Sequence, residues 1–231
     1  MDIIRISAVI AKQKIPFFYL LCGGFLLCLA LAGWPAQAQE AAWTLQKEKS
    51  GVSVYKRPFK KKKGKETKAV MEVEASVASL VALVKDSDAG PQWLSRINVF
   101  KTFEELSPSE WYTYAEASLP FPYTNRDLIT LNSIWQDSLS KTVRVYLKGD
   151  WKRLPEKEGL VRIKEAEGFW QFRPINAQKT EVIYQFYAEP HLDLPAWIKD
   201  PIIANGLITT MKNMRQQAAK SKYQKVKSIG F

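Results

Sequence analysis

The sequence predicts an α+β domain in which a long antiparallel sheet is followed by one long helix at the carboxyl end. The first observation is that apolar and polar residues alternate in many segments between residues 51 and 189, as in strands with one buried face. The alternation is clearest at Val143, Val145 and Leu147. The second is that, after Pro195, apolar residues recur in steps of three and four, as on one face of a helix. A sheet that buries such a helix has to wrap around it, which leaves room for an elongated cavity.

The same patterns place the elements along the chain. Residues 51–56 and 68–75 alternate and predict two strands, joined by a polar, lysine-rich turn at 60–65. Residues 76–85 have helical spacing and predict a short helix. Further strands are expected at the alternating segments 99–106, 110–119, 127–136, 142–148, 160–165, 168–173 and 181–189. The last helix is expected to run from Pro195 to Tyr223, and its apolar stripe consists of Ile203, Leu207, Met211, Met214 and Ala218.

Residues 1–38 have the pattern of a secretory signal peptide. A basic leader precedes an apolar run from Ile15 to Ala32, and Ala36 and Ala38 occupy the small positions of an A-x-A cleavage site. We therefore expect cleavage between Ala38 and Gln39 and export to the bacterial periplasm. Because the apolar run is nearly long enough to span a bilayer, an uncleaved membrane anchor is the alternative.

Composition limits the chemistry of the exported chain. It has one histidine, His191, and two cysteines, Cys22 and Cys28, which both lie inside the predicted signal peptide. Removal of the peptide leaves no thiol for a disulfide, a nucleophile or a metal ligand, and a single histidine does not make a zinc site. We expect no metal and no cofactor. The formal net charge of +11, from 34 lysines and arginines against 23 acidic residues, favours anionic partners.

The mature chain is expected to form one domain over residues 43–223, because no internal repeat or flexible linker divides it. A short segment, 39–42, precedes the domain and a basic tail, 224–231, follows it. The turn of the first hairpin carries four successive lysines: Lys60, Lys61, Lys62 and Lys63. This cluster is either a solvated turn or a surface that docks on an anionic membrane, where each nearby lysine adds about 1 kcal/mol. Nucleic acid is not expected as a partner, because no recognised binding motif is present.

Residues 120–127, which read PFPYTNRD, resemble the P-x-P-x-x-N-R-D segment of START domains, the lipid transfer modules related to the steroidogenic acute regulatory protein. Further matching pieces follow in the family's order: GVSVY at 51–55, DSD at 86–88 with QW at 92–93, GLVRI at 159–163 and LPAWI at 194–198. The resemblance covers residues 43–223. It implies a helix-grip fold, in which a curved antiparallel sheet surrounds the C-terminal helix and a hydrophobic tunnel holds one lipid.

The resemblance does not extend to the residues that read a lipid head group. Where phosphatidylcholine-binding members have an acid after the tryptophan and an arginine three residues before it, this chain has Leu94 and Gly90. Where sterol-binding members have a second arginine six residues beyond the N-R-D arginine, this chain has Asn132. The implied partner is therefore a lipid or other hydrophobic small molecule of unassigned class.

Candidate ligand contacts follow from side-chain chemistry and from the place of the last helix in the family's tunnel. They are the polar residues Glu116, Arg126 and Asn132, the aromatic residues Trp93, Trp170 and Tyr184, and the helix residues Ile203, Leu207, Met211 and Met214. The structural alternative for the aromatic and helix residues is plain core. For Arg126 and Asp127 it is an ion pair or a set of hydrogen bonds that stabilise a turn. Glu116 lies on a strand whose inner side the sequence does not show. Inside a cavity, burial would raise the pKa of Glu116 and leave a neutral hydrogen-bond partner for a ligand.

The leading functional hypothesis is a non-enzymatic carrier that transfers a hydrophobic molecule between membranes. The family resemblance implies a gate formed by the last helix and nearby loops, here around 120–124 and 189–195. One alternative is a helix-grip enzyme, a cyclase or hydrolase, with Glu116 or His191 as its general base. Another is an envelope interaction module without a ligand, which predicts a filled interior.

Overall fold

The computed structural model describes residues 41–60, 63–189 and 195–229 of the 231-residue chain. The predicted signal peptide and its cleavage site lie outside the described residues. The same holds for Lys61 and Lys62 of the lysine cluster and for His191.

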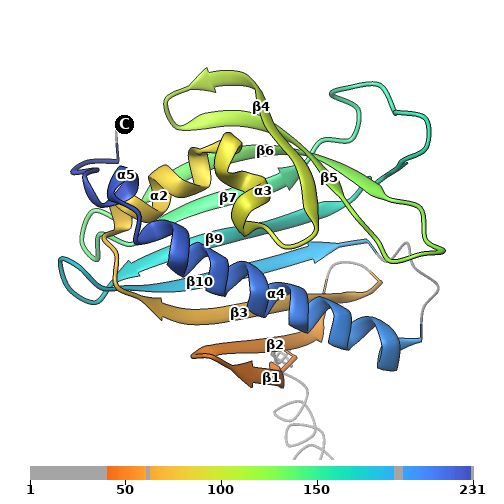
Figure 1. The fold of residues 1–231 in the computed structure, drawn as a ribbon, viewed down its shortest axis with the longest axis horizontal. Helices are drawn as coiled ribbons and strands as arrows, with labels where there is room; N and C mark the ends of the chain where they lie inside the picture. Colours follow the sequence, from red (N-terminus) through yellow and green to blue (C-terminus); the bar gives the residue numbers. More distant parts are fainter. Residues whose placement is uncertain (1–40, 61–62, 190–194, 230–231) are drawn as a thin grey trace, which may run out of the picture. The chain divides into compact units, whose positions relative to one another are not determined.

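The domain is built on one ten-stranded sheet (Figure 1). Its strands are β1 Thr44–Lys49, β2 Val52–Pro58, β3 Lys65–Val73, β4 Ile97–Ser107, β5 Glu110–Ala117, β6 Arg126–Gln136, β7 Val143–Gly149, β8 Val161–Arg162, β9 Ala166–Pro174 and β10 Thr180–Ala188. Across the sheet they follow the order β1-β2-β3-β10-β9-β7-β6-β5-β4 with antiparallel neighbours, and the short β8 pairs in parallel with β6. The last strand among the described residues, β10, therefore lies in the middle of the sheet between β3 and β9.

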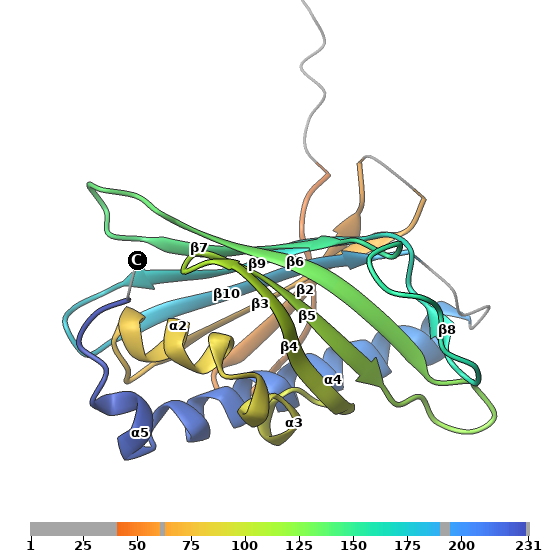
Figure 2. The same ribbon diagram turned by 90° about the horizontal axis from the view of Figure 1, so that it is seen from above.

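The helical segments gather on one face of this sheet (Figure 2). They are α2 Val77–Lys85, η1 Ser87–Ala89, α3 Gly90–Trp93, α4 Ala196–Ala218 and α5 Ser221–Gln224. Ser76 is the N-cap of α2. Its hydroxyl accepts a hydrogen bond from the backbone N–H of Ser79 and satisfies one donor of the first turn. The predicted α+β class is confirmed: a curved antiparallel sheet packs against a long C-terminal helix in the helix-grip arrangement.

The alternation along each strand decides which side chains meet α4. In the middle of the sheet, a row of register partners runs through five strands: Val52, Met71, Val182, Phe172 and Val143. All of them are buried. Because successive side chains of a strand point to opposite faces, the alternate apolar positions combine into one continuous inner face.

Helix α4 buries a different stripe from the predicted one in its first half. Its buried apolar residues are Ala204, Ile208, Met211, Met214 and Ala218. Ile203 is 38% exposed and Leu207 is only partly buried against the core, so the predicted stripe is wrong there by one position. Steps of three and four residues fit the helical period from either starting point, and only the position of the sheet distinguishes them.

Other boundaries also differ from the prediction. The strand expected at 160–165 is reduced to Val161–Arg162, and β1 is an edge strand of mainly polar residues that show no alternation. The last helix ends at Ala218 and α5 follows as a separate turn. In the described part of the chain, no helix combines the length and the apolar character needed to cross a bilayer.

Candidate ligand-binding cavity

A cavity of about 860 Å³ lies between the first half of α4 and the inner face of the sheet. It is bordered by the β2–β3 loop at Gly64, by the β5–β6 loop at Pro120 and by Glu189 after β10. The apolar part of its wall includes Val54, Ala117, Leu119, Ile163, Ala188, Ile202, Ile203 and Ala204. A space between helix and sheet is therefore present, as the wrapped sheet predicts.

The wall changes from apolar to charged along the elements that build it. On the inner face of β2, Val54 is buried in the core and the next inner position is Lys56. On α4, the charged Lys199 and Asp200 lie about one turn before the buried Ala204. The charged end of the cavity thus lies at the start of α4, and the apolar end continues toward the core.

Five cationic side chains and two carboxylates line the cavity. The cations are Lys56, Lys63, Lys65, Arg126 and Lys199, and the carboxylates are Glu189 and Asp200. Asp200 pairs with Lys56 and, over 3.4 Å, with Lys65. Burial alone would raise the pKa of Asp200, but its hydrogen bonds and charge interactions with the two lysines lower that pKa below its ordinary value. The ionised carboxylate therefore holds the start of α4 against β2 and β3.

Arg126 and Asp127, neighbours in the sequence motif, point to opposite faces of β6. Arg126 is the register partner of Ala117, and both residues line the cavity. Asp127 lies on the outer face, where its carboxylate accepts hydrogen bonds of 2.8 and 2.7 Å from Arg162. The motif therefore supplies one cavity residue and one structural residue from adjacent positions.

Glu116 does not face the cavity, and the role predicted for it there is wrong. It precedes the cavity residue Ala117, so its side chain lies on the outer face of β5. There it accepts hydrogen bonds from Lys157 Nζ at 2.9 Å and from the Tyr114 hydroxyl at 2.8 Å. These bonds, that of Lys157 first, lower the pKa of Glu116, whereas the predicted role required burial to raise it.

The predicted aromatic contacts form a connected group in the interior. Trp93 meets Trp170 edge-on with 5.5 Å between ring centroids, and Trp170 stacks on Tyr184 at 4.1 Å. Burial raises the pKa of Tyr184. Trp93 and Trp170 belong to the same core cluster as Met211 and Met214, which are fully buried. These side chains pack the core that borders the apolar end of the cavity.

Asn132 is buried on the inner face, where the protein itself uses its side-chain amide. The amide donates hydrogen bonds to the backbone oxygens of Trp111 and Thr130, at 3.1 and 3.2 Å, and to Thr113 Oγ1 at 3.0 Å. The hydroxyls of Thr113 and Thr130 lie 2.7 Å apart. This network joins β5 to β6 beside the apolar core.

The cavity wall combines two predicted contacts with residues that sequence reasoning missed. Of the predicted contacts, Arg126 and Ile203 line it. The missed charged residues include Lys56, Lys199 and Asp200. Lys56 carries a signal, because it occupies an inner position of an alternating strand. Lys199 and Asp200 carry no such signal, because a helical turn of mixed polarity does not show which of its sides the sheet covers.

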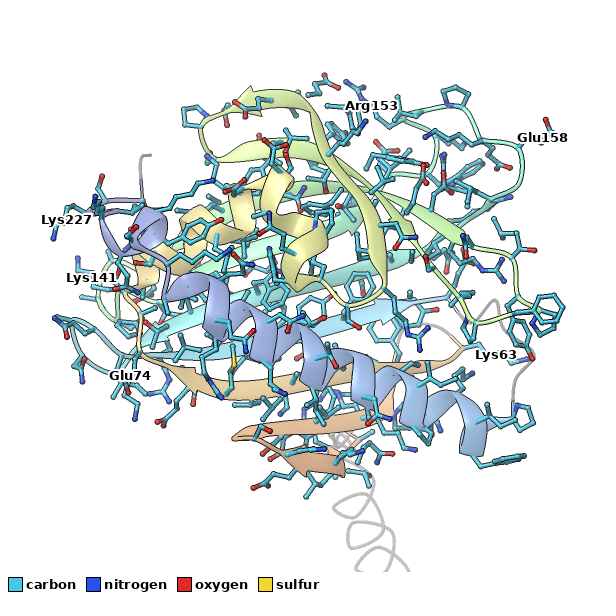
Figure 3. All side chains as sticks on the ribbon, in the orientation of Figure 1. Lys63, Glu74, Lys141, Arg153, Glu158 and Lys227 are labelled. Carbon is cyan, nitrogen blue, oxygen red and sulfur yellow. The ribbon has the colours of Figure 1, made fainter. Side chains whose placement is uncertain are left out.

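Two large aromatic side chains are exposed beside the charged end of the cavity. Phe121, in the β5–β6 loop, is 97% exposed, and Trp197, in the first turn of α4, is 77% exposed. The residues that precede them in the chain, Pro120 and Ala196, line the cavity. Lys63 lies at this same end of the domain (Figure 3). Exposed rings next to lysines are typical of a surface that contacts another phase or molecule.

Comparison with known proteins connects this architecture with lipid transfer modules. The START domain model matches residues 35–223. An uncharacterised protein of Pseudomonas aeruginosa is 29% identical over 195 residues, which cover 84% of this chain and 96% of that protein. The human phosphatidylcholine transfer protein is 26% identical over 178 residues, covering 75% of this chain and 82% of its own length.

Solved structures show the same likeness. A fragment of the STAR-related lipid transfer protein from Xanthomonas axonopodis superposes with a TM-score of 0.69 at 25% identity, covering 77% of this chain and 99% of that one. Human StAR-related lipid transfer protein 5 superposes with a TM-score of 0.68 at 16% identity, covering 87% and 95% of the two chains. The second likeness is one of fold alone.

Proposed function

Because this chain belongs to the START domain family, we propose that it binds a lipid between α4 and the sheet and carries it between membranes without catalysing a reaction. The observation that carries the proposal is the cavity of about 860 Å³, which is apolar toward the core and charged at one end. Each Å² of apolar lipid surface that leaves water for such a cavity contributes about 25 cal/mol. Relatives named as lipid transfer proteins support the same role.

The proposed place of action is the bacterial periplasm, reached through the signal peptide at residues 1–38. Cell fractionation followed by N-terminal sequencing tests this proposal. A periplasmic protein that starts at Gln39 is the expected result. A membrane-bound protein that keeps its first residues would favour the anchor alternative instead.

We expect the charged end of the cavity to face the membrane during transfer. Lys60 and Lys63 are exposed at this end, and Phe121 and Trp197 are exposed beside them. Lysines near a bilayer are attracted to anionic lipids, and aromatic rings are favoured at the membrane–water interface. Docking in this orientation would open the cavity directly toward the bilayer.

No observation on the described residues favours the enzyme alternative. Glu116 lies on the outer face of β5 with Tyr114 and Lys157, away from the cavity. Within the described ranges, no three His, Cys, Asp or Glu side chains come together in a metal-binding arrangement. The interaction-module hypothesis predicts a filled interior, whereas a cavity lies between α4 and the sheet.

Transfer between vesicles tests the proposed function. The mature protein should accelerate transfer of a fluorescent phospholipid from donor to acceptor vesicles and should retain one lipid per chain in native mass spectrometry. Ala117→Trp places a bulky ring inside the cavity and should weaken both effects strongly, because the lipid loses part of its space. Ala177→Trp, in the exposed β9–β10 turn, is the matched control. Wild-type transfer by a folded Ala117→Trp protein would contradict the proposal.

A further inference from the structure

The cavity has the two-ended character that suits an amphiphile. Ile202 and Ala204 of α4 and Ala117 and Ala188 of the sheet line its apolar part. The charged wall residues come one turn earlier on α4 and at the ends of the strands nearest that turn. A pure hydrocarbon placed here would strip water from these charges without replacing its hydrogen bonds, which is unfavourable. An amphiphile with its polar head at this end avoids that cost.

Among the described residues that line this end, five cations stand against two carboxylates. Lys56 and Lys65 share the single carboxylate of Asp200. The other wall carboxylate, Glu189, uses its Oε1 to accept two backbone N–H groups, at 2.5 and 2.9 Å, from the segment before β9. Lys63, Arg126 and Lys199 add three further cations to the wall. A wall of this composition attracts and stabilises a negative group.

Arg126 has the geometry that matches such a group. A guanidinium is planar and binds a carboxylate or phosphate through two parallel hydrogen bonds. The neighbouring acid, Asp127, lies on the other face of β6 and is occupied by Arg162. Arg126 and Asp127 therefore serve opposite faces of β6.

We propose that the lipid carried by this protein has an anionic head group, a carboxylate or a phosphate with net negative charge, which Arg126 and Lys199 bind at the charged end of the cavity. The inference rests on the proposed lipid-binding function and adds its substrate class. An anionic head group loses its water shell on entering this site, and the attraction of several nearby cations offsets that cost. A zwitterionic head would place its ammonium group among the lysines and leave their excess charge uncompensated.

Binding of monomeric short-chain lipids tests this inference without any membrane. The delipidated mature protein is titrated with dihexanoyl phosphatidylglycerol and with dihexanoyl phosphatidylcholine, both below their aggregation concentrations. The two probes share their tails and differ in head-group charge. We expect the anionic probe to bind at least about tenfold more tightly, with an advantage that shrinks as salt screens the charges.

Variants assign the preference to residues. Arg126→Gln and, independently, Lys199→Gln should each reduce the ratio of the two affinities several-fold, so that misfolding of one variant leaves the other as a test. Lys141→Gln is the matched control, because Lys141 lies at the opposite end of the domain from Lys63 (Figure 3). Inorganic phosphate at millimolar concentration should not displace the anionic probe, because it has no tail to bury.

The outcomes separate this inference from the function on which it rests. Equal affinity for the two probes, or an unchanged ratio in both folded cavity variants, would overturn the anionic head group and leave lipid binding intact. Displacement of the anionic probe by inorganic phosphate would show that the site binds a simple anion, and would overturn the proposal that it binds an amphiphile. Failure of the wild-type protein to bind either probe would overturn the proposed function together with this inference.

Discussion

The carboxylate of Asp127 and the guanidinium of Arg162 face each other through two parallel hydrogen bonds, and both side chains are only 1% exposed. The same guanidinium donates to the backbone carbonyls of Trp151, Leu154 and Pro155 over 2.9 to 3.1 Å. Asp127 therefore fixes, through one arginine, the segment that crosses the outer face of β6. Its role is structural, although its neighbour lines the cavity.

Asp127→Asn should lower the free energy of unfolding by about 3–5 kcal/mol, because it leaves the charge of Arg162 buried without its counter-ion. Urea denaturation measures the loss. Glu181→Gln serves as control, because it breaks an ion pair with Arg173, whose side chain is 53% exposed, and should cost at most about 1 kcal/mol. A similar, small loss in both variants would show that the buried pair carries little of the stability.

Asp200→Asn should speed lipid exchange several-fold, because it removes the contacts that Lys56 and Lys65 make with the start of α4. In the wild-type protein these contacts lower the pKa of Asp200 below its ordinary 3.8, although burial opposes the shift. Their stabilising effect is therefore present above that value and is lost as pH falls through the lowered pKa. Exchange should be slow at neutral pH and accelerate only below about pH 4.

Stopped-flow transfer measured over a pH series checks this expectation. The Asp200→Asn protein should exchange quickly at every pH, and acid should add little to its rate. Glu74→Gln is the control, because Glu74 is exposed away from the cavity (Figure 3). If acid accelerated lipid exchange by the Asp200→Asn protein as steeply as by the wild type, a group other than Asp200 would control the exchange.

Phe121→Ser and Trp197→Ser should each weaken binding to anionic vesicles by about tenfold or more, because full burial of a large apolar side chain contributes about 1.5–3 kcal/mol. Neither change should alter stability, because both rings are exposed. Vesicle flotation measures the binding. Leu139→Ser is the matched control, since Leu139 is 92% exposed in the turn between β6 and β7. An equal loss for Leu139→Ser would disprove docking through the cavity end.

Met214→Ala should destabilise the protein by about 2–5 kcal/mol, because it opens a void in a packed core. Ile203→Ala should cost far less stability and instead weaken lipid binding, because Ile203 is 38% exposed and lines the cavity. Thermal unfolding and lipid titration of the two variants separate the core face of α4 from its cavity face. Loss of binding without loss of stability in Met214→Ala would assign Met214 to the ligand.

Much of the fold could be predicted from local pattern. The strand predicted at 142–148 is β7, Val143–Gly149, and the strand predicted at 127–136 is β6, Arg126–Gln136. These predictions succeed because a sheet covered on one face imposes a period of two on its sequence. The pattern fails at β1 and β8, where an edge strand and a two-residue strand impose no such burial.

The candidate site was predictable only in part, because a residue belongs to it only if its side chain lies on the inner face of the sheet or on the cavity side of α4. Arg126 and Glu116 lie on paired strands, yet one lines the cavity and the other bonds Lys157 outside it. A shift of one residue along a strand reverses the face, and an isolated strand does not show which face is inner. On α4 the sequence likewise does not show whether Ile203 or its neighbour Ala204 is the buried position.

The sequence by itself determined the class of fold, the positions of most strands along the chain, the position of the last helix and the likeness to START domains, because these depend on periodicity and on short motifs. Only the tertiary structure decided that Lys56, Arg126 and Asp200 share one cavity wall and that Asp127 serves the opposite face. The physical reason is that strands from distant parts of the chain and the start of α4 meet only after the sheet has curved around the helix. Burial and charge pairing of each side chain are set by those neighbours.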